Sequence, residues 1–115
     1  MPGNLNEMLK GLRTSIETIA SAIVSRDGIL LASDVPPGVY TETFAIMCAT
    51  ILGAAVTANS ELKKGIPERI IIEGKDSKTI IMGAGKKSLI VAVVSPQIEI
   101  QKVLTELSKI SENIK

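Results

Sequence analysis

The chain has 115 residues, of which 45% are apolar and 22% charged, and its 13 basic and 12 acidic side chains leave a net charge of +1. These values are typical of one folded domain over residues 1–115 and exclude a disordered chain. The even mixture of charges also excludes the basic stripe that most nucleic-acid-binding domains carry, so we expect no nucleic-acid partner.

The residue types that usually carry chemistry are scarce. Histidine is absent, and the aromatic residues are Tyr40 and Phe44 alone. An enzyme with this sequence would therefore lack histidine, the commonest proton carrier near neutral pH, and a zinc site would lack its usual ligands. The three aspartates lie in three separate predicted turns, which favours turn formation over a metal site. We expect a protein that is not an enzyme and that holds no cofactor and no metal.

The N-terminal third predicts a helix followed by a β-hairpin. Apolar residues recur at helical spacing over residues 5–16, and Asn4 precedes them as a candidate N-cap. Residues 19–25 and 29–33 are apolar runs on either side of an Asp-Gly pair, which is among the strongest short signals for a hairpin.

A long helix is predicted over residues 41–64. Thr41 is placed to cap its first turn, Gly65 suits the left-handed position after its last turn, and Pro67 blocks its continuation. The longest mostly apolar run inside it, residues 44–58, is shorter than the roughly 18–20 residues that span a bilayer. We therefore expect no membrane insertion.

The remaining residues predict three strands and a helix. The strands are expected at residues 68–73, 78–84 and 88–94, and the helix begins near residue 98. The strands are apolar at consecutive positions, so both faces of the sheet are expected to be covered. The resulting order, α-β-β-α-β-β-β-α, predicts an α/β (α+β) fold with a sheet sandwiched between helices.

The long helix carries two apolar stripes when its residues are laid out at 100° intervals. The first stripe is expected to dock on the sheet and comprises Phe44, Met47, Cys48, Ile51, Ala55, Ala58 and Leu62. The second comprises Ala45, Ala49, Leu52, Gly53, Val56 and Ser60. A glycine inside a helix costs about 1 kcal/mol relative to alanine, which suggests a packing role for Gly53.

The second stripe could meet another helix of the same chain or a second copy of the chain. Both terminal helices are amphipathic and need a sheet face of their own, which leaves the long helix alone on the other face. We therefore favour a homodimer, because an uncovered apolar stripe is an interaction site.

Three other features favour ordinary structural roles. Residues 83–88 superficially resemble a phosphate-binding loop, but they lack its first glycine and join two strands, so a β-turn is the favoured interpretation. Arg26 at the hairpin tip could act as an arginine finger, although a solvated turn residue is the simpler interpretation. The single cysteine, Cys48, lies among apolar residues and implies no disulfide, which fits a cytoplasmic location.

The sequence resembles the roadblock/LC7 domain family. Residues 25–33, Ser-Arg-Asp-Gly-Ile-Leu-Leu-Ala-Ser, look like the first hairpin of that domain, and residues 68–74, 80–82 and 89–93 are similar to its second half. The order of elements also matches over the whole chain. The composition, rich in Ile and Lys, suits a prokaryotic member.

The resemblance implies a five-stranded antiparallel sheet with the long helix on one face and the terminal helices on the other, as in roadblock and profilin-like folds. Family members typically dimerise through paired middle helices and through the strand that here spans residues 68–73. The dimer interface would then contain the second stripe together with Arg69 and Ile71.

The resemblance also implies a function. Members are non-catalytic scaffolds or regulators of Ras-like small GTPases, and MglB-like members promote GTP hydrolysis without inserting an arginine. The GTPase often docks on the paired middle helices, at positions that correspond here to Ile46, Thr50, Thr57, Glu61 and Lys64. The alternatives are a heterodimer with a paralogue and a small-ligand sensor of profilin-like or PAS-like architecture.

Overall fold

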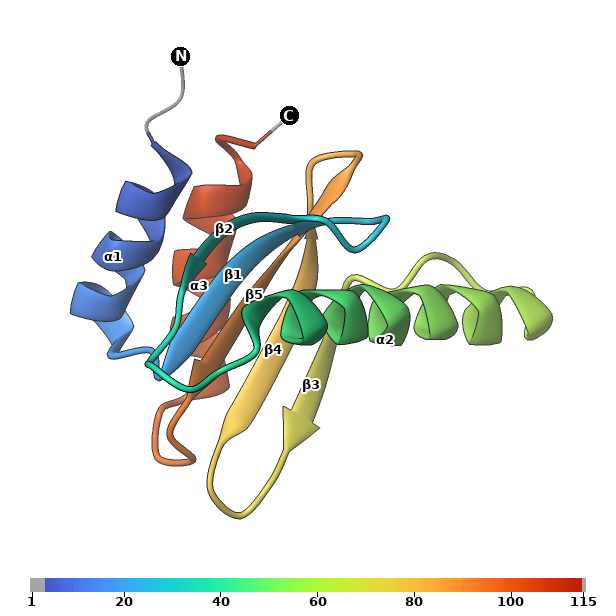
Figure 1. The fold of residues 1–115 in the computed structure, drawn as a ribbon. Helices are drawn as coiled ribbons and strands as arrows, with labels where there is room; N and C mark the ends of the chain where they lie inside the picture. Colours follow the sequence, from blue (N-terminus) through green and yellow to red (C-terminus); the bar gives the residue numbers. More distant parts are fainter. Residues whose placement is uncertain (1–3, 115) are drawn as a thin grey trace.

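The computed structural model describes residues 4–114, which form an antiparallel sheet of five strands with helices on both faces (Figure 1). The elements are α1 (Leu5–Ile16), β1 (Ala20–Ser25), β2 (Leu30–Asp34), α2 (Thr41–Glu61), β3 (Arg69–Glu73), β4 (Lys78–Ala84), β5 (Ser88–Val94) and α3 (Ile100–Ser111). Their order confirms the prediction. Helices α1 and α3 lie side by side on one face, and α2 crosses the other.

The strands are arranged in the order β2-β1-β5-β4-β3, and every neighbouring pair is antiparallel. The N-terminal hairpin and the C-terminal three-stranded meander are joined by pairing of β1 with β5, for example Ala22 opposite Val91. Strands β2 and β3 are therefore the two edges of the sheet.

Successive residues of the central strands enter two separate cores. Ile80 belongs to the core under α1 and α3, and its neighbour Ile81 belongs to the core under α2. This explains the consecutive apolar residues, because side chains alternate between the faces of a strand. Both faces are thus covered over β1, β4 and β5, as predicted.

Strand β3 differs from this prediction. Ile71 and Ile72 retain 40% and 42% exposure, and most of the strand is exposed. The strand is an edge: Ile70 packs against the core under α2, and Arg69 lies beside α3, where it lines a shallow hollow with Gln101 and Thr105. The fold of one chain therefore leaves part of the apolar surface of β3 exposed.

The helix ends were predicted with mixed success. The side chain of Asn4 accepts a hydrogen bond from the backbone N–H of Asn6 at 2.8 Å, which confirms the N-cap of α1. Thr41 is not a cap: the N-cap position of α2 is Tyr40, without a side-chain hydrogen bond. Gly65 is not the left-handed residue either, because the helix ends at Glu61 and Lys63 takes the positive φ of 58°.

Candidate functional site

Helix α2 docks on the sheet along a line that runs between the two predicted stripes. Its buried residues are Ala45, Cys48 and Leu52, which pack with Val24, Ile81, Leu89 and Val91 of the sheet. Ala45 and Leu52 come from the stripe that we had expected at the surface. The structure corrects that expectation, since both are core residues of their own chain.

The exposed residues of α2 also come from both stripes. Met47 is 49% exposed and Leu62 is 69% exposed, although both were expected to face the sheet. Gly53 and Ser60 are exposed, whereas Ala49 and Val56 are half-buried. The docking direction is therefore rotated from the predicted one, and it leaves an apolar flank on each side of the helix.

One flank lies beside the β1–β2 turn, and we call it the hairpin flank (Ala49, Gly53 and Ser60). A Cβ built on Gly28 of that turn would lie 3.4 Å from Cγ1 of Ile46, and Arg26 lines a cavity together with Ala49 and Gly53. The opposite flank, which we call the free flank, consists of Met47, Ile51, Ala54 and Ala58. These four positions lie within about 60° of one another around the helix.

Most of the predicted partner-binding residues share the outer face of α2. Ile46, Thr50, Thr57 and Glu61 are all exposed and follow one another at intervals of one or two helical turns. Lys64 is exposed just beyond the end of the helix. The geometry thus brings the four helical residues together and places Lys64 next to them in the chain.

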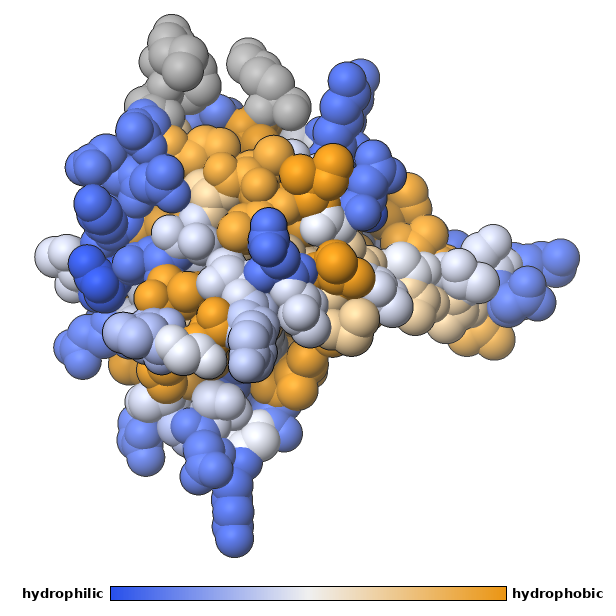
Figure 2. Space-filling view, viewed as in Figure 1, coloured by the Kyte–Doolittle hydropathy of each residue, from blue (hydrophilic) through white to orange (hydrophobic). Residues whose placement is uncertain are grey.

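The C-terminal half of α2 projects beyond the sheet at the β3 edge (Figure 1). On the face that Figure 2 draws, its surface is neutral to apolar along its length, and its end carries both polar and apolar residues. By length and composition α2 could cross a membrane, with a mean hydropathy of 1.5 over 18 residues of which 22% are buried. The same length and hydropathy also occur in core helices of soluble proteins, although such helices are mostly buried.

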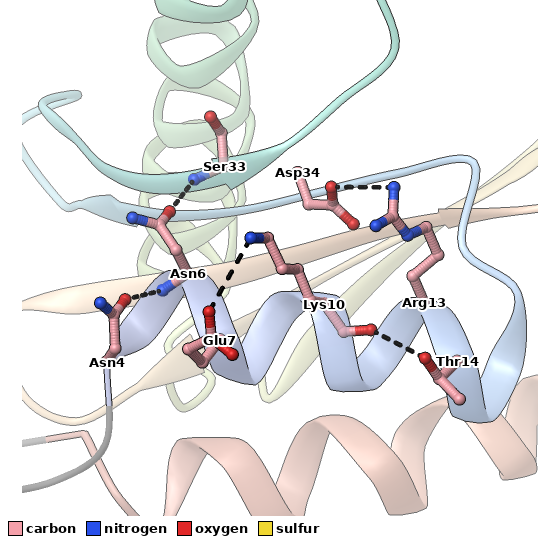
Figure 3. Close-up of polar contacts among 8 residues, drawn as sticks. All are labelled: Asn4, Asn6, Glu7, Lys10, Arg13, Thr14, Ser33 and Asp34. Carbon is pink, nitrogen blue, oxygen red and sulfur yellow. Dashed lines mark hydrogen bonds and ion pairs between the residues drawn. The ribbon is translucent and has the colours of Figure 1, made fainter.

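The two edges of the sheet differ in how they are covered. On β2, the Ser33 N–H donates to the Asn6 side chain at 3.3 Å, and Asp34 pairs with Arg13 of α1 at 3.3 Å (Figure 3). On β3, nothing among residues 4–114 pairs with the outer edge, and the predicted interface residues Arg69 and Ile71 are exposed there. An open edge of this kind is ready to pair with another strand.

Cys48 is a core residue of the α2 face. Burial raises the pKa of its thiol from 9.0 to about 11, because the apolar surroundings disfavour the thiolate. This agrees with its predicted role as a small apolar residue. Residues 85–87 form the turn between β4 and β5, and Gly85 has a φ of +70°, which confirms a β-turn where the sequence resembled a phosphate loop.

This fold is similar to those of several known structures. The structure of Myxococcus xanthus MglB superposes with a TM-score of 0.88 at 15% identity, covering 95% of this chain and 89% of that one. The gliding protein MglB of Thermus thermophilus gives 0.83 at 20% identity, covering 93% and 82%. Profilin IA of Acanthamoeba castellanii gives 0.60 at 16% identity, covering 90% and 92%.

Comparison at the level of sequence identifies the family. The chain is 28% identical over 95 residues to protein MJ1340 of Methanocaldococcus jannaschii, which covers 83% of this chain and 82% of that protein. The model of the Roadblock/LC7 domain matches residues 5–94, from the start of α1 to the end of β5. The chain therefore belongs to the Roadblock/LC7 domain family.

Proposed function

We propose that this chain is a non-catalytic, homodimeric regulator or scaffold that binds a Ras-like small GTPase in the cytoplasm. The observation that carries the proposal is the position of α2. This helix is the longest among residues 4–114, only 22% of the residues in its apolar 18-residue window are buried, and it projects past an open sheet edge. In a family whose members regulate such GTPases, this surface supports assembly with partners rather than catalysis.

The dimer would form at the β3 edge. Pairing of β3 with its copy would satisfy the open backbone groups and bury Ile71, and Arg69 would lie at the same edge. The two sheets would then become continuous. A paralogue with the same open edge would pair in the same way and give a heterodimer.

The projecting half of each α2 would lie against the other chain. We assign the helix contact to the free flank, because the β1–β2 turn already occupies the N-terminal part of the hairpin flank. Met47, Ala54 and Ala58 would therefore be interface residues that the sequence pattern did not select. Gly53 and Ser60, the exposed residues of the predicted stripe, would contact the partner only if the hairpin flank were the one that pairs.

The outer face of the paired helices would bind the GTPase. Ile46, Thr50, Thr57 and Glu61 point away from the sheet, and Lys64 adds a charge at the helix end. Because the partner chains would cover the apolar flanks, α2 would need no membrane to remove its surface from water.

The test is a binding measurement with Ras-like GTPases encoded in the same genome, each loaded with GDP or with a non-hydrolysable GTP analogue. We expect one of them to bind, with different affinities for its two nucleotide states, and the chain alone to hydrolyse no GTP. Failure of every such GTPase to bind in either state would contradict the proposal.

The binding face is tested by a matched pair of threonine variants. In Thr50 the hydroxyl donates to the Ile46 carbonyl at 2.8 Å, and in Thr105 of α3 it donates to the Gln101 carbonyl at 3.0 Å. Thr50→Arg is expected to weaken GTPase binding at least tenfold, or about 1.4 kcal/mol, and Thr105→Arg to leave it unchanged. Equal effects of the two substitutions would remove α2 from the binding site.

A further inference from the structure

Arg26 occupies a place that depends on a glycine in a neighbouring strand. Its backbone N–H donates to the Lys87 carbonyl at 2.8 Å, so the β1–β2 and β4–β5 turns lie side by side at one end of the sheet (Figure 1). Its guanidinium lies over Gly83 of β4, where a Cβ would be 2.7 Å from Nη2. Any larger residue at position 83 would displace the guanidinium.

This guanidinium forms one wall of a cavity of about 230 Å³. The other walls come from α2 and β5, and all of them are apolar or small: Ala49, Leu52, Gly53, Val56 and Leu89. Leu52 and Leu89 are buried and belong to the core below. Gly53 widens the cavity, because it places no side chain on this flank of the helix.

Arg26 is an exposed residue, and its cation lacks a counter-charge in the chain beside this cavity. Among residues 4–114, no group accepts a hydrogen bond from the Arg26 side chain and no carboxylate lies within ion-pair distance of it. Lys86 and Lys87 in the adjoining turn add positive charge, and Asp27 is the one acidic residue in the two turns. The cavity therefore offers a forked cationic donor beside an apolar chamber, which suits a carboxylate with an apolar body.

We propose that this cavity, the Arg26 pocket, binds a small aliphatic carboxylic acid. The carboxylate would accept two hydrogen bonds from the guanidinium, and a chain of about five to eight carbons would lie against Ala49, Gly53 and Val56, above the buried Leu52 and Leu89. The cavity is smaller than the 300–1,000 Å³ usual for drug-sized ligands, which limits the ligand to this size. Such a site goes beyond partner binding, since it gives the chain a small-molecule ligand of its own.

Sodium hexanoate is the probe, titrated into ¹⁵N-labelled chain and followed through the backbone amide resonances. We expect saturable shifts centred on Arg26, Gly53, Gly83 and Leu89. Hexanamide, which has the same carbon chain without the charge, is expected to bind at least tenfold more weakly. Equal binding of the two compounds, shifts centred elsewhere, or the absence of saturable shifts would overturn the proposal.

Two variants test separately how the charge of Arg26 and the space in the cavity contribute to binding. Arg26→Met keeps an apolar stem over Gly83 and is expected to weaken hexanoate binding at least tenfold while leaving hexanamide binding unchanged. Gly53→Leu fills the cavity and is expected to weaken both. Gly11→Leu on the exposed face of α1 is the matched control, since a Cβ meets nothing within 4 Å at either glycine.

The amide spectrum of each variant shows whether it has folded, and a folded Arg26→Met that binds hexanoate as the unchanged chain does would overturn the assignment. The titration needs neither a GTPase nor a measurement of mass. Failure here would therefore leave the proposed dimer and its partner untouched, and failure of GTPase binding would leave the Arg26 pocket untouched.

Discussion

The side-chain oxygen of Asn6 in α1 accepts a hydrogen bond from the backbone N–H of Ser33 at 3.3 Å and so closes the outer edge of β2. The ion pair between Arg13 and Asp34 fastens the same helix to the same strand. The β3 edge has no such cover among residues 4–114. This asymmetry leaves one edge of the sheet available for a partner strand and protects the other.

Asn6→Ala is expected to lower the free energy of unfolding by about 0.5–1.5 kcal/mol, because it removes the one side-chain acceptor of the Ser33 N–H. Urea denaturation measures the change. Asn113→Ala is the control, since the Asn113 side chain donates only to the nearby Lys109 carbonyl at 3.1 Å. If the two substitutions cost the same, the contact between Asn6 and β2 contributes nothing specific.

Ile71→Lys is expected to weaken self-association at least tenfold, which is about 1.4 kcal/mol, because it places a charge at the centre of the open β3 edge. Dilution series in the analytical ultracentrifuge give the dissociation constant. Leu31→Lys is the matched control: Leu31 is 46% exposed and lies in β2, the opposite edge. An Ile71→Lys chain that associates like the unchanged one would exclude β3 from the interface.

The flank of α2 that meets the partner is decided by two substitutions in its projecting half. Ala58→Glu on the free flank is expected to weaken the dimer at least tenfold, since it would bury a carboxylate against apolar surface. Ser60→Glu on the hairpin flank is expected to change it little. The opposite result would show that the stripe selected from the sequence is the true interface.

Cys48 predicts a pH dependence. Because burial raises its pKa from 9.0 to about 11, the folded chain keeps the thiol neutral at pH values where the unfolded chain ionises it. The stabilisation is complete below pH 9 and is lost as the pH rises toward 11. The urea midpoint of the unchanged chain should therefore fall more steeply across this window than that of Cys48→Ala, and parallel profiles would contradict the assignment.

The sequence was sufficient for the elements and their layers. Hydrophobic periodicity located each helix and strand, and the amphipathic terminal helices identified the face that α2 has to itself. Among the strands, the prediction that both faces are covered was wrong for β3. A continuous run usually means burial on both faces, but Ile71 and Ile72 lie at an edge that one chain does not cover.

The sequence was not sufficient for the rotation of α2. Small and apolar residues surround most of this helix, and the pattern divided them into two stripes. The short polar face of Thr50, Thr57 and Glu61 lies opposite the line between these stripes, which is where the helix docks. The structure shows that Cys48 and Ala45 from different stripes both face the sheet. Contacts between distant segments could not be predicted from the sequence either. Gly83 and Arg26 are an example, because no local pattern identifies a glycine that makes room for a guanidinium.

The proposed function requires this chain to be half of a two-chain binding platform. Light scattering during size-exclusion chromatography, at tens of micromolar chain concentration, measures the mass of the species in solution. We predict a single species with twice the 12.2 kDa mass of the chain, and Ile71→Lys should shift it toward the single-chain mass. A monodisperse species of 12.2 kDa for the unchanged chain would contradict the two-chain platform.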